Sequence, residues 1–80
     1  MTIGQVVFTK CGRDKGRAFV TINVENEYLY LVDGKLRTLN KPKKKKAKHV
    51  QLTNFVASLD VGSRGLQDAD IRKILAAFAK

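Results

Sequence analysis

Three cations and two glycines occupy six residues near the N-terminus, in the stretch GRDKGR. The cations are Arg13, Lys15 and Arg17, and the glycines are Gly12 and Gly16. Glycine adopts positive φ at little cost and lets another backbone come close. A guanidinium group donates paired hydrogen bonds to phosphate oxygens, whereas an ammonium group acts as a point charge. The spacing therefore predicts a loop that binds phosphate, and the alternative is a turn whose cations only keep it soluble.

Two residues beside these cations have roles of their own. We expect Asp14 either to restrain one of the arginines or to cap the turn. Cys11 is the only cysteine, so no internal disulfide can form, which suits a reducing compartment such as the cytoplasm. We expect a small buried thiol rather than a nucleophile or a ligand, and we find no signal-peptide pattern in the first residues.

Most of the excess charge lies in a second region. Residues 35–48 hold eight cations and no acid, whereas the rest of the chain holds eight cations against seven acids. The net charge of +9 is therefore concentrated there, and it should attract a polyanion. Nucleic acid is favoured over a membrane because no amphipathic helix or lipidation motif accompanies the lysines. The cations are Lys35, Arg37, Lys41, Lys43, Lys44, Lys45, Lys46 and Lys48.

Short apolar and alternating segments predict a sheet. Ala18, Val20, Ile22 and Val24 alternate with more polar positions, so we place them on one face of a strand. Asn26 suits the positive φ of the next turn. The expected strands cover residues 4–9, 18–24, 28–32, 35–39 and 49–52. Five short strands joined by tight turns predict a small half-open barrel.

The Asp33-Gly34 pair predicts a two-residue type I′ hairpin turn between the third and fourth strands. In that register Leu36 shares the inner face with Leu29 and Leu31. The outer face then carries Tyr28, Tyr30, Lys35 and Arg37. Cations opposite aromatic rings form favourable pairs, and they can receive a sugar-phosphate edge or an unstacked base. The alternative is that both tyrosines pack beneath a C-terminal helix.

We expect residues 41–48, KPKKKKAK, to be a flexible basic segment, because Pro42 and the crowded lysines disfavour regular structure. Such a tether still binds phosphates, with no sequence specificity. His49 is expected at a strand edge, with donation to phosphate as the alternative.

One domain is expected from a chain of 80 residues. The barrel would occupy residues 1–55, and a connector with Gly62 and Gly65 would cover 56–66. The spacing of apolar residues predicts a helix over residues 67–79, packed on the same domain, with Asp68 and Asp70 at its positive N-terminal end. Its apolar face consists of Ile71, Ile74, Leu75 and Phe78.

The first loop and its flanks resemble the KOW motif of ribosomal proteins and transcription elongation factors. The matching residues are Gly4, Val6, Val7, Gly12, Lys15, Gly16, Val20 and Ile22. Ala18 and Phe19 stand where many KOW sequences have a further glycine. The LVDG sequence at 31–34 is similar to the archaeal and eukaryotic large-subunit ribosomal KOW protein "fourteen-e". With the lysine run and the helix, the chain also resembles small stand-alone KOW proteins of Gram-positive bacteria.

This resemblance implies a mostly β, SH3-like five-stranded barrel with one C-terminal α-helix. It also implies a ribosome-associated or ribosomal-protein-like RNA-binding protein, with large-subunit ribosomal RNA and ribosomal proteins as partners. The alternatives are a protein-interaction module of the transcription or translation machinery, which would use the apolar helix face, and nonspecific DNA binding. The residues expected to contact RNA are Gly12, Arg13, Lys15, Gly16, Arg17, Tyr30, Lys35, Arg37, Lys41, Lys43, Lys44, Lys45, Lys46, Lys48 and His49.

We expect no enzyme activity, cofactor, metal, membrane or small-molecule substrate. One histidine and one cysteine form no zinc site. The carboxylates lie in turns and at the helix start, so no catalytic arrangement with a nucleophile can be argued.

Overall fold

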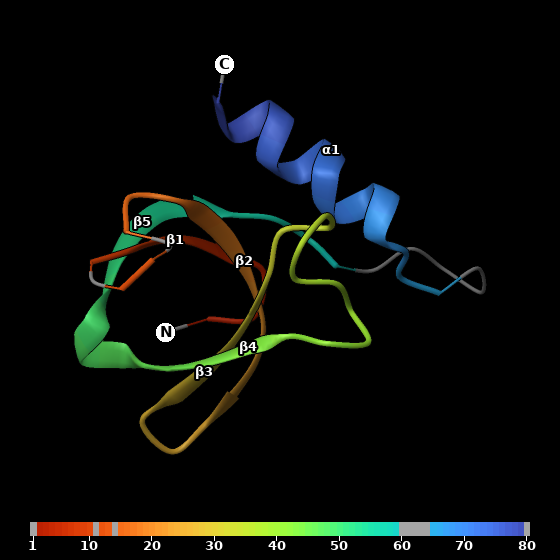
Figure 1. The fold of residues 1–80 in the computed structure, drawn as a ribbon. Coiled ribbons are helices and arrows are strands. Elements are labelled where there is room, and N and C mark those ends of the chain that lie inside the picture. Colours follow the sequence, from red (N-terminus) through yellow and green to blue (C-terminus); the bar gives the residue numbers. More distant parts are fainter. Residues whose placement is uncertain (1, 11, 14, 60–64, 80) are drawn as a thin grey trace.

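The computed structural model describes residues 2–10, 12–13, 15–59 and 65–79. It contains a five-stranded antiparallel sheet and a C-terminal helix (Figure 1), which confirms the mostly β fold expected from the sequence. Cys11, Asp14 and Gly62 lie outside the described residues. The elements are β1 (Gln5–Thr9), β2 (Ala18–Glu25), β3 (Tyr28–Val32), β4 (Lys43–Lys46), β5 (Val50–Val56) and α1 (Asp68–Ala79).

The sheet is curled. Its strand order is β4-β3-β2-β1-β5, so β4 and β5 are its two edges. A 3₁₀ turn, Ala47–His49, joins these edges directly. Three residues of 3₁₀ helix advance only about 6 Å, so the edges must approach each other at this turn. Figure 1 shows the strands wrapping round accordingly.

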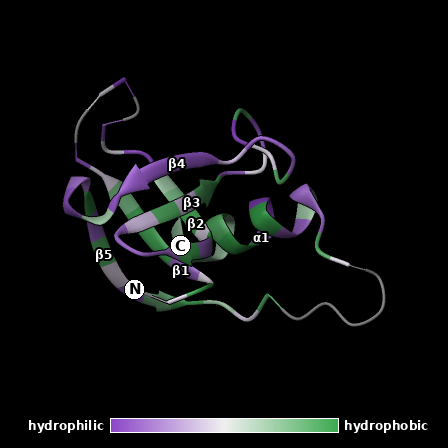
Figure 2. Cartoon of the chain, turned by 90° about the horizontal axis from the view of Figure 1, so that it is seen from below, coloured by the Kyte–Doolittle hydropathy of each residue, from purple (hydrophilic) through white to green (hydrophobic). Residues whose placement is uncertain are grey.

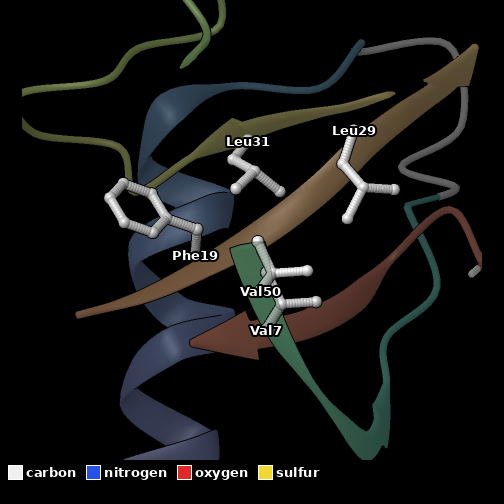
Figure 3. Packing of buried hydrophobic residues seen from close by; sticks show 5 residues of the cluster. All are labelled: Val7, Phe19, Leu29, Leu31 and Val50. Atoms are coloured by element: carbon white, nitrogen blue, oxygen red, sulfur yellow. The ribbon is translucent and has the colours of Figure 1, made fainter. Parts of the chain in front are cut away.

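The central strands β1 and β2 carry buried residues on both faces of the sheet. Successive residues of a strand point to opposite faces, so β1 and β2 supply neighbouring residues to two separate clusters. The inner cluster consists of Val7, Phe19, Leu29, Leu31 and Val50 (Figure 3). The outer cluster is centred on Val6, Val20, Val32 and Ile71.

Helix α1 covers one end of the outer face with the apolar residues predicted for it. Ile71 is fully buried, and Ile74, Leu75 and Phe78 pack around the outer cluster. The ring centroid of Phe78 lies 5.5 Å from those of two phenylalanines of the sheet. Within the described ranges, no helix is long and apolar enough to cross a bilayer. The apolar face of α1 is thus part of the core of this domain.

The start of α1 is fixed by its acidic residues. The carboxylate of Asp70 accepts a hydrogen bond from the backbone N–H of Gln67 at 2.9 Å. The carboxylate of Asp68 accepts one from the backbone N–H of Leu39 at 2.8 Å. Both acids lie in the first turn, as predicted, where they also complement the helix dipole. The bond to Leu39 ties the helix to the loop that follows β3.

Residues 35–39 do not form the predicted fourth strand. The carboxylate of Asp33 accepts hydrogen bonds from the backbone N–H groups of Lys35 and Arg37, both at 2.9 Å. The N–H of Asp33 in turn donates to the carbonyl of Arg37 at 2.9 Å. These bonds close a wide loop in place of the two-residue turn. Leu36, predicted on the inner face, is 72% exposed.

The fourth strand is formed instead by the lysines that were expected to be flexible. In β4, Lys46 pairs with Tyr28 and Lys44 pairs with Tyr30. Backbone groups of β3 need partners whatever side chains the partner strand carries. Lysines also suit an edge strand, because their charge keeps other strands from pairing with it. Figure 2 shows β4 as a hydrophilic strand beside the more apolar sheet. The prediction of irregular structure is therefore wrong for Lys43–Lys46.

Two further boundaries differ from the predictions. Strand β5 continues to Val56 and so takes in part of the expected connector. In β2, the register against β3 shifts between Thr21 and Asn23. The extra residue reverses the alternation, so Val24 packs on the inner cluster although Ile22 packs on the outer one. Asn26, with φ of 55°, adopts the turn conformation expected of it.

Candidate nucleic-acid interface

Backbone hydrogen bonds hold the loop between β1 and β2 at its base. The N–H of Thr9 donates to the carbonyl of Arg17 at 3.2 Å, and the N–H of Gly16 donates to the carbonyl of Thr9 at 2.8 Å. Gly12 and Gly16 have φ of 86° and 83°, in the region that favours glycine. The predicted role of both glycines in shaping this loop is confirmed.

The three cations of this loop have different environments. The side chains of Arg13 and Lys15 are exposed. A guanidinium nitrogen of Arg17 lies 2.9 Å from a carboxylate oxygen of Asp33, whose side chain is only 6% exposed. The guanidinium of Arg17 also lies 5.9 Å from the ring centroid of Phe19. Two cations therefore face solvent, and the third fixes the base of the loop, which revises the expectation that all three extend together.

Tyrosines of β3 and lysines of β4 form a second surface, the Tyr–Lys face, which consists of Tyr28, Tyr30, Lys44 and Lys46. The ammonium nitrogen of Lys44 lies 4.6 Å from the ring centroid of Tyr28 and 5.8 Å from that of Tyr30. The ammonium nitrogen of Lys46 lies 5.8 Å from the ring of Tyr28. These distances are within cation–π range.

The predicted pairing of cations with aromatic rings therefore occurs, but with different partners. The predicted hairpin register placed Arg37 opposite Tyr30, with Lys35 on the same face. The structure places Lys46 opposite Tyr28 and Lys44 opposite Tyr30. The outer cluster beneath α1 is built from other residues, and both tyrosine side chains are half-buried beside the lysines.

The loop and β4 meet at Gly12. The ammonium nitrogen of Lys45 lies 3.5 Å from the point that a Cβ on Gly12 would occupy. The N–H of Lys10 donates to the carbonyl of His49 at 2.9 Å, which ties the loop to the 3₁₀ turn as well. Lys45 pairs with Leu29 and therefore lies on the side of β4 opposite Lys44 and Lys46. The loop thus adjoins the edge strand that carries the Tyr–Lys face, and we call these neighbouring segments together the basic face. Its members are Gly12, Arg13, Lys15, Tyr28, Tyr30, Lys44, Lys45, Lys46, Lys48 and His49.

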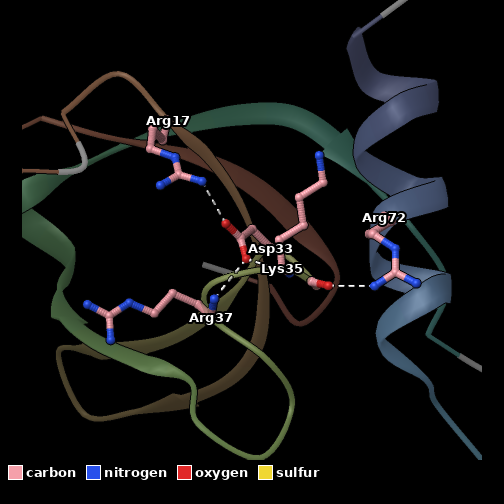
Figure 4. Close-up of polar contacts among 6 residues, drawn as sticks. Arg17, Asp33, Lys35, Arg37 and Arg72 are labelled. Atoms are coloured by element: carbon pink, nitrogen blue, oxygen red, sulfur yellow. Dashed lines mark hydrogen bonds and ion pairs between the residues drawn. The ribbon is translucent and has the colours of Figure 1, made fainter.

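The remaining predicted cations fall elsewhere. Asp33 gathers Arg17, Lys35 and Arg37 around its carboxylate, through one guanidinium and two backbone N–H groups (Figure 4). Lys43 is the first residue of β4, opposite Leu31, and is half-buried. Lys41 is exposed in the segment that leads into β4, outside the basic face.

Sequence reasoning missed two residues of this region. Asp33 was expected only to shape a turn, and its ion pair joins positions 16 residues apart in the chain. Arg72 of α1 was not predicted at all, yet its guanidinium donates to the carbonyl of Gly34 at 2.6 Å. No local pattern links either residue to its partner. The only sign of a structural role for Asp33 in the sequence is its position between the apolar residues 28–32 and the basic residues 35–48.

The basic face combines groups that bind phosphates with groups that stack on bases. Lysine and arginine supply sequence-independent contacts to a phosphate backbone, and tyrosine rings offer platforms for unstacked bases. No protein-family model and no curated protein matches this chain. Its function is therefore inferred from the surface itself and from the resemblance of the loop to the KOW motif.

Proposed function

We propose that this chain is a KOW-like RNA-binding protein with an SH3-like barrel, which binds large-subunit ribosomal RNA through the basic face in the cytoplasm. The observation that carries the proposal is the junction at Gly12, where the glycine-rich loop meets Lys45 of β4. A loop with exposed cations thereby lies beside the edge strand that carries cations over aromatic rings. The proposed role is binding, without catalysis.

The charges on this surface are available for exchange with phosphate. Lys46 lies 3.5 Å from Glu27, but the two side chains are 38% and 69% exposed. An ion pair so exposed contributes little to stability, so a phosphate can replace the carboxylate at little cost. Arg13 and Lys15 are exposed on the adjoining loop. Contacts of this kind release counterions and make RNA affinity strongly dependent on salt.

The alternative function, a protein-interaction module, is less well supported, because the surface proposed for it packs inside this domain. That alternative needed Ile71, Ile74, Leu75 and Phe78 to face a partner protein. These residues pack on the outer cluster of the same chain. RNA binding is therefore the better-supported function.

A competition experiment separates RNA binding from general attraction to polyanions. Filter binding to a folded fragment of large-subunit ribosomal RNA would be challenged with duplex DNA of the same sequence. We expect the RNA to compete at least tenfold better, because tyrosine platforms need unstacked bases that a duplex does not offer. Equal competition would contradict a function specific to RNA.

Association with the ribosome requires its own test. Cell extract would be sedimented through sucrose gradients at low and high salt, and the protein would be followed by immunoblot. We expect it to migrate with the large subunit at low salt. Loss at high salt would identify a peripheral factor, and retention would identify an integral component. Migration only at the top of the low-salt gradient would contradict the ribosomal assignment.

A further inference from the structure

A groove of about 540 Å³ lies between helix α1 and the loop that follows β3. This volume falls within the range of pockets that hold small ligands, about 300–1,000 Å³. The groove is separate from the Tyr–Lys face, and none of its lining residues belongs to the basic face. Its lining residues are Arg17, Ala18, Asp33, Lys35, Arg72, Leu75, Ala76 and Ala79.

The groove carries an excess of positive charge. Arg17, Lys35 and Arg72 line it, and Figure 4 shows Lys35 between the two arginines. Among the described lining residues, Asp33 is the only acid, and its carboxylate already binds Arg17 and two backbone N–H groups. The bond from Arg72 to the carbonyl of Gly34 holds that guanidinium in place. Three cations against one engaged carboxylate leave a field that attracts an anion.

The groove also has an apolar wall. Leu75, Ala76 and Ala79 line it from α1, at the helical spacing that places them on one face with Arg72. Alanine side chains are short, so this wall leaves room for a flat apolar group. The groove therefore fits a ligand with an anionic end and a flat apolar end.

We propose that this groove receives one unpaired nucleotide of the bound RNA. Its phosphate would lie at Arg17, Lys35 and Arg72, and its base would lie against the alanines of α1. This inference rests on the proposed function, because the nucleotide belongs to the same RNA. RNA is favoured over an acidic peptide because Arg17 both ends the glycine-rich loop and lines the groove.

Three RNAs test the inference with the full-length protein. The first is a fully paired hairpin, the second has a single bulged nucleotide, and the third has an abasic residue at the bulge. We expect the wild-type protein to bind the bulged hairpin about tenfold more tightly than the paired one, because the bulged base removes apolar surface from water when it lies against the alanines. The abasic bulge should lose most of this preference.

A matched pair of variants tests whether the groove causes the preference for the bulged hairpin. Ala76→Glu places a carboxylate in the groove, whereas Ala77→Glu makes the same charge change on α1 outside the lining residues. Both alanines are exposed, so both variants should fold, which a melting curve would check. We expect Ala76→Glu to bind the paired and bulged hairpins equally and Ala77→Glu to keep the preference. If Ala76→Glu does not fold, Lys35→Gln provides the same comparison at a cation that lines the groove.

The outcomes separate this inference from the proposed function. A wild-type protein that binds neither hairpin contradicts RNA binding altogether. Equal binding of both hairpins, or equal losses in Ala76→Glu and Ala77→Glu, overturns the groove inference alone. If an acidic hexapeptide binds wild type but not Ala76→Glu, and the bulge has no effect, the groove is a peptide site and the inference is wrong.

Discussion

Asp33 determines the shape of the region around it with a single carboxylate. The residue is 5% exposed, and its carboxylate binds the guanidinium of Arg17 and the N–H groups of Lys35 and Arg37. A buried carboxylate needs such partners, because burial without them is costly. The wide loop supplies these donors, and a two-residue hairpin turn would not bring both N–H groups to the same oxygen.

Arg13 and Arg17 should respond differently to the same substitution. Arg13 is exposed, so Arg13→Ala should leave the melting temperature unchanged and weaken binding to structured RNA about tenfold, the effect of one lost charged hydrogen bond. Arg17→Ala leaves Asp33 without its ion pair and should cost about 1 kcal/mol of stability. Thermal melting and filter binding measure the two effects. Wild-type RNA affinity in Arg13→Ala would exclude the loop as a contact surface.

The tyrosine rings are predicted to act through stacking. Replacement of Tyr28 and Tyr30 by leucine keeps apolar groups in the half-buried positions but removes the aromatic faces. We expect the double leucine variant to lose about 1–3 kcal/mol of RNA binding for each base that stacks. The double phenylalanine variant should bind nearly as well as wild type in the same titration. A leucine variant that binds as tightly as the phenylalanine variant would argue against stacking.

At the scale of elements, local sequence patterns predicted secondary structure well, whereas features that depend on contacts between distant residues were missed. The limits of β3 and the apolar face of α1 follow from residues within each segment. In β2 the predicted alternation holds from Ala18 to Ile22 and fails at Val24, because the register against β3 shifts between Thr21 and Asn23. The Asp33-Gly34 pair also carried a strong turn signal, but Arg17 lies 16 residues away and captures the aspartate. The contact between Arg17 and Asp33 cannot be predicted from the local pattern around the turn.

The lysine strand illustrates the same limit. Composition alone favoured a flexible segment, because four consecutive lysines repel one another. Strand β3, however, presents a row of backbone groups that need partners. Tyr28 and Tyr30 also attract ammonium groups, which offsets part of the repulsion. The sequence thus identified the residues of the candidate site better than it identified their arrangement.

The contact between α1 and the loop after β3 depends on Gly34. Its φ is 77°, and an added Cβ would lie 2.6 Å from the carbonyl oxygen of Asp68 and 2.8 Å from Cγ of Arg72. Gly65 has a similar φ of 82°, but no atom lies within 4 Å of its added Cβ. The two glycines therefore form a matched pair for substitution by alanine.

Gly65→Ala should cost only the backbone strain, about 1–2 kcal/mol. Gly34→Ala should cost more and lower the melting temperature further, because the helix must also shift away from the loop. The difference between the two variants, measured by thermal or chemical unfolding, isolates the packing of the loop against the helix. Equal losses would show that this contact does not constrain the helix.

At the scale of the whole molecule, the curled sheet holds basic residues that are close together in the sequence on its edge strand β4. The loop after β1 meets β4 at Gly12 and meets Asp33 through Arg17, so it links the edge strand to the groove. Lys44 and Lys46 are then held beside aromatic rings rather than on a free tether. A folded basic surface loses less conformational freedom on binding than a tether does.

The salt dependence of RNA binding tests most directly whether the basic face contacts phosphates. The logarithm of the association constant should fall with the logarithm of salt concentration by about 0.7 for each phosphate contact in single-stranded RNA. Six contacts would give a slope near −4 by the same rule. The double variant Lys44→Gln with Lys46→Gln should reduce the magnitude of the slope by about 1.4. Lys73→Gln removes an exposed charge on α1 and should leave the slope unchanged. The same slope in wild type and the double variant would contradict the proposed interface.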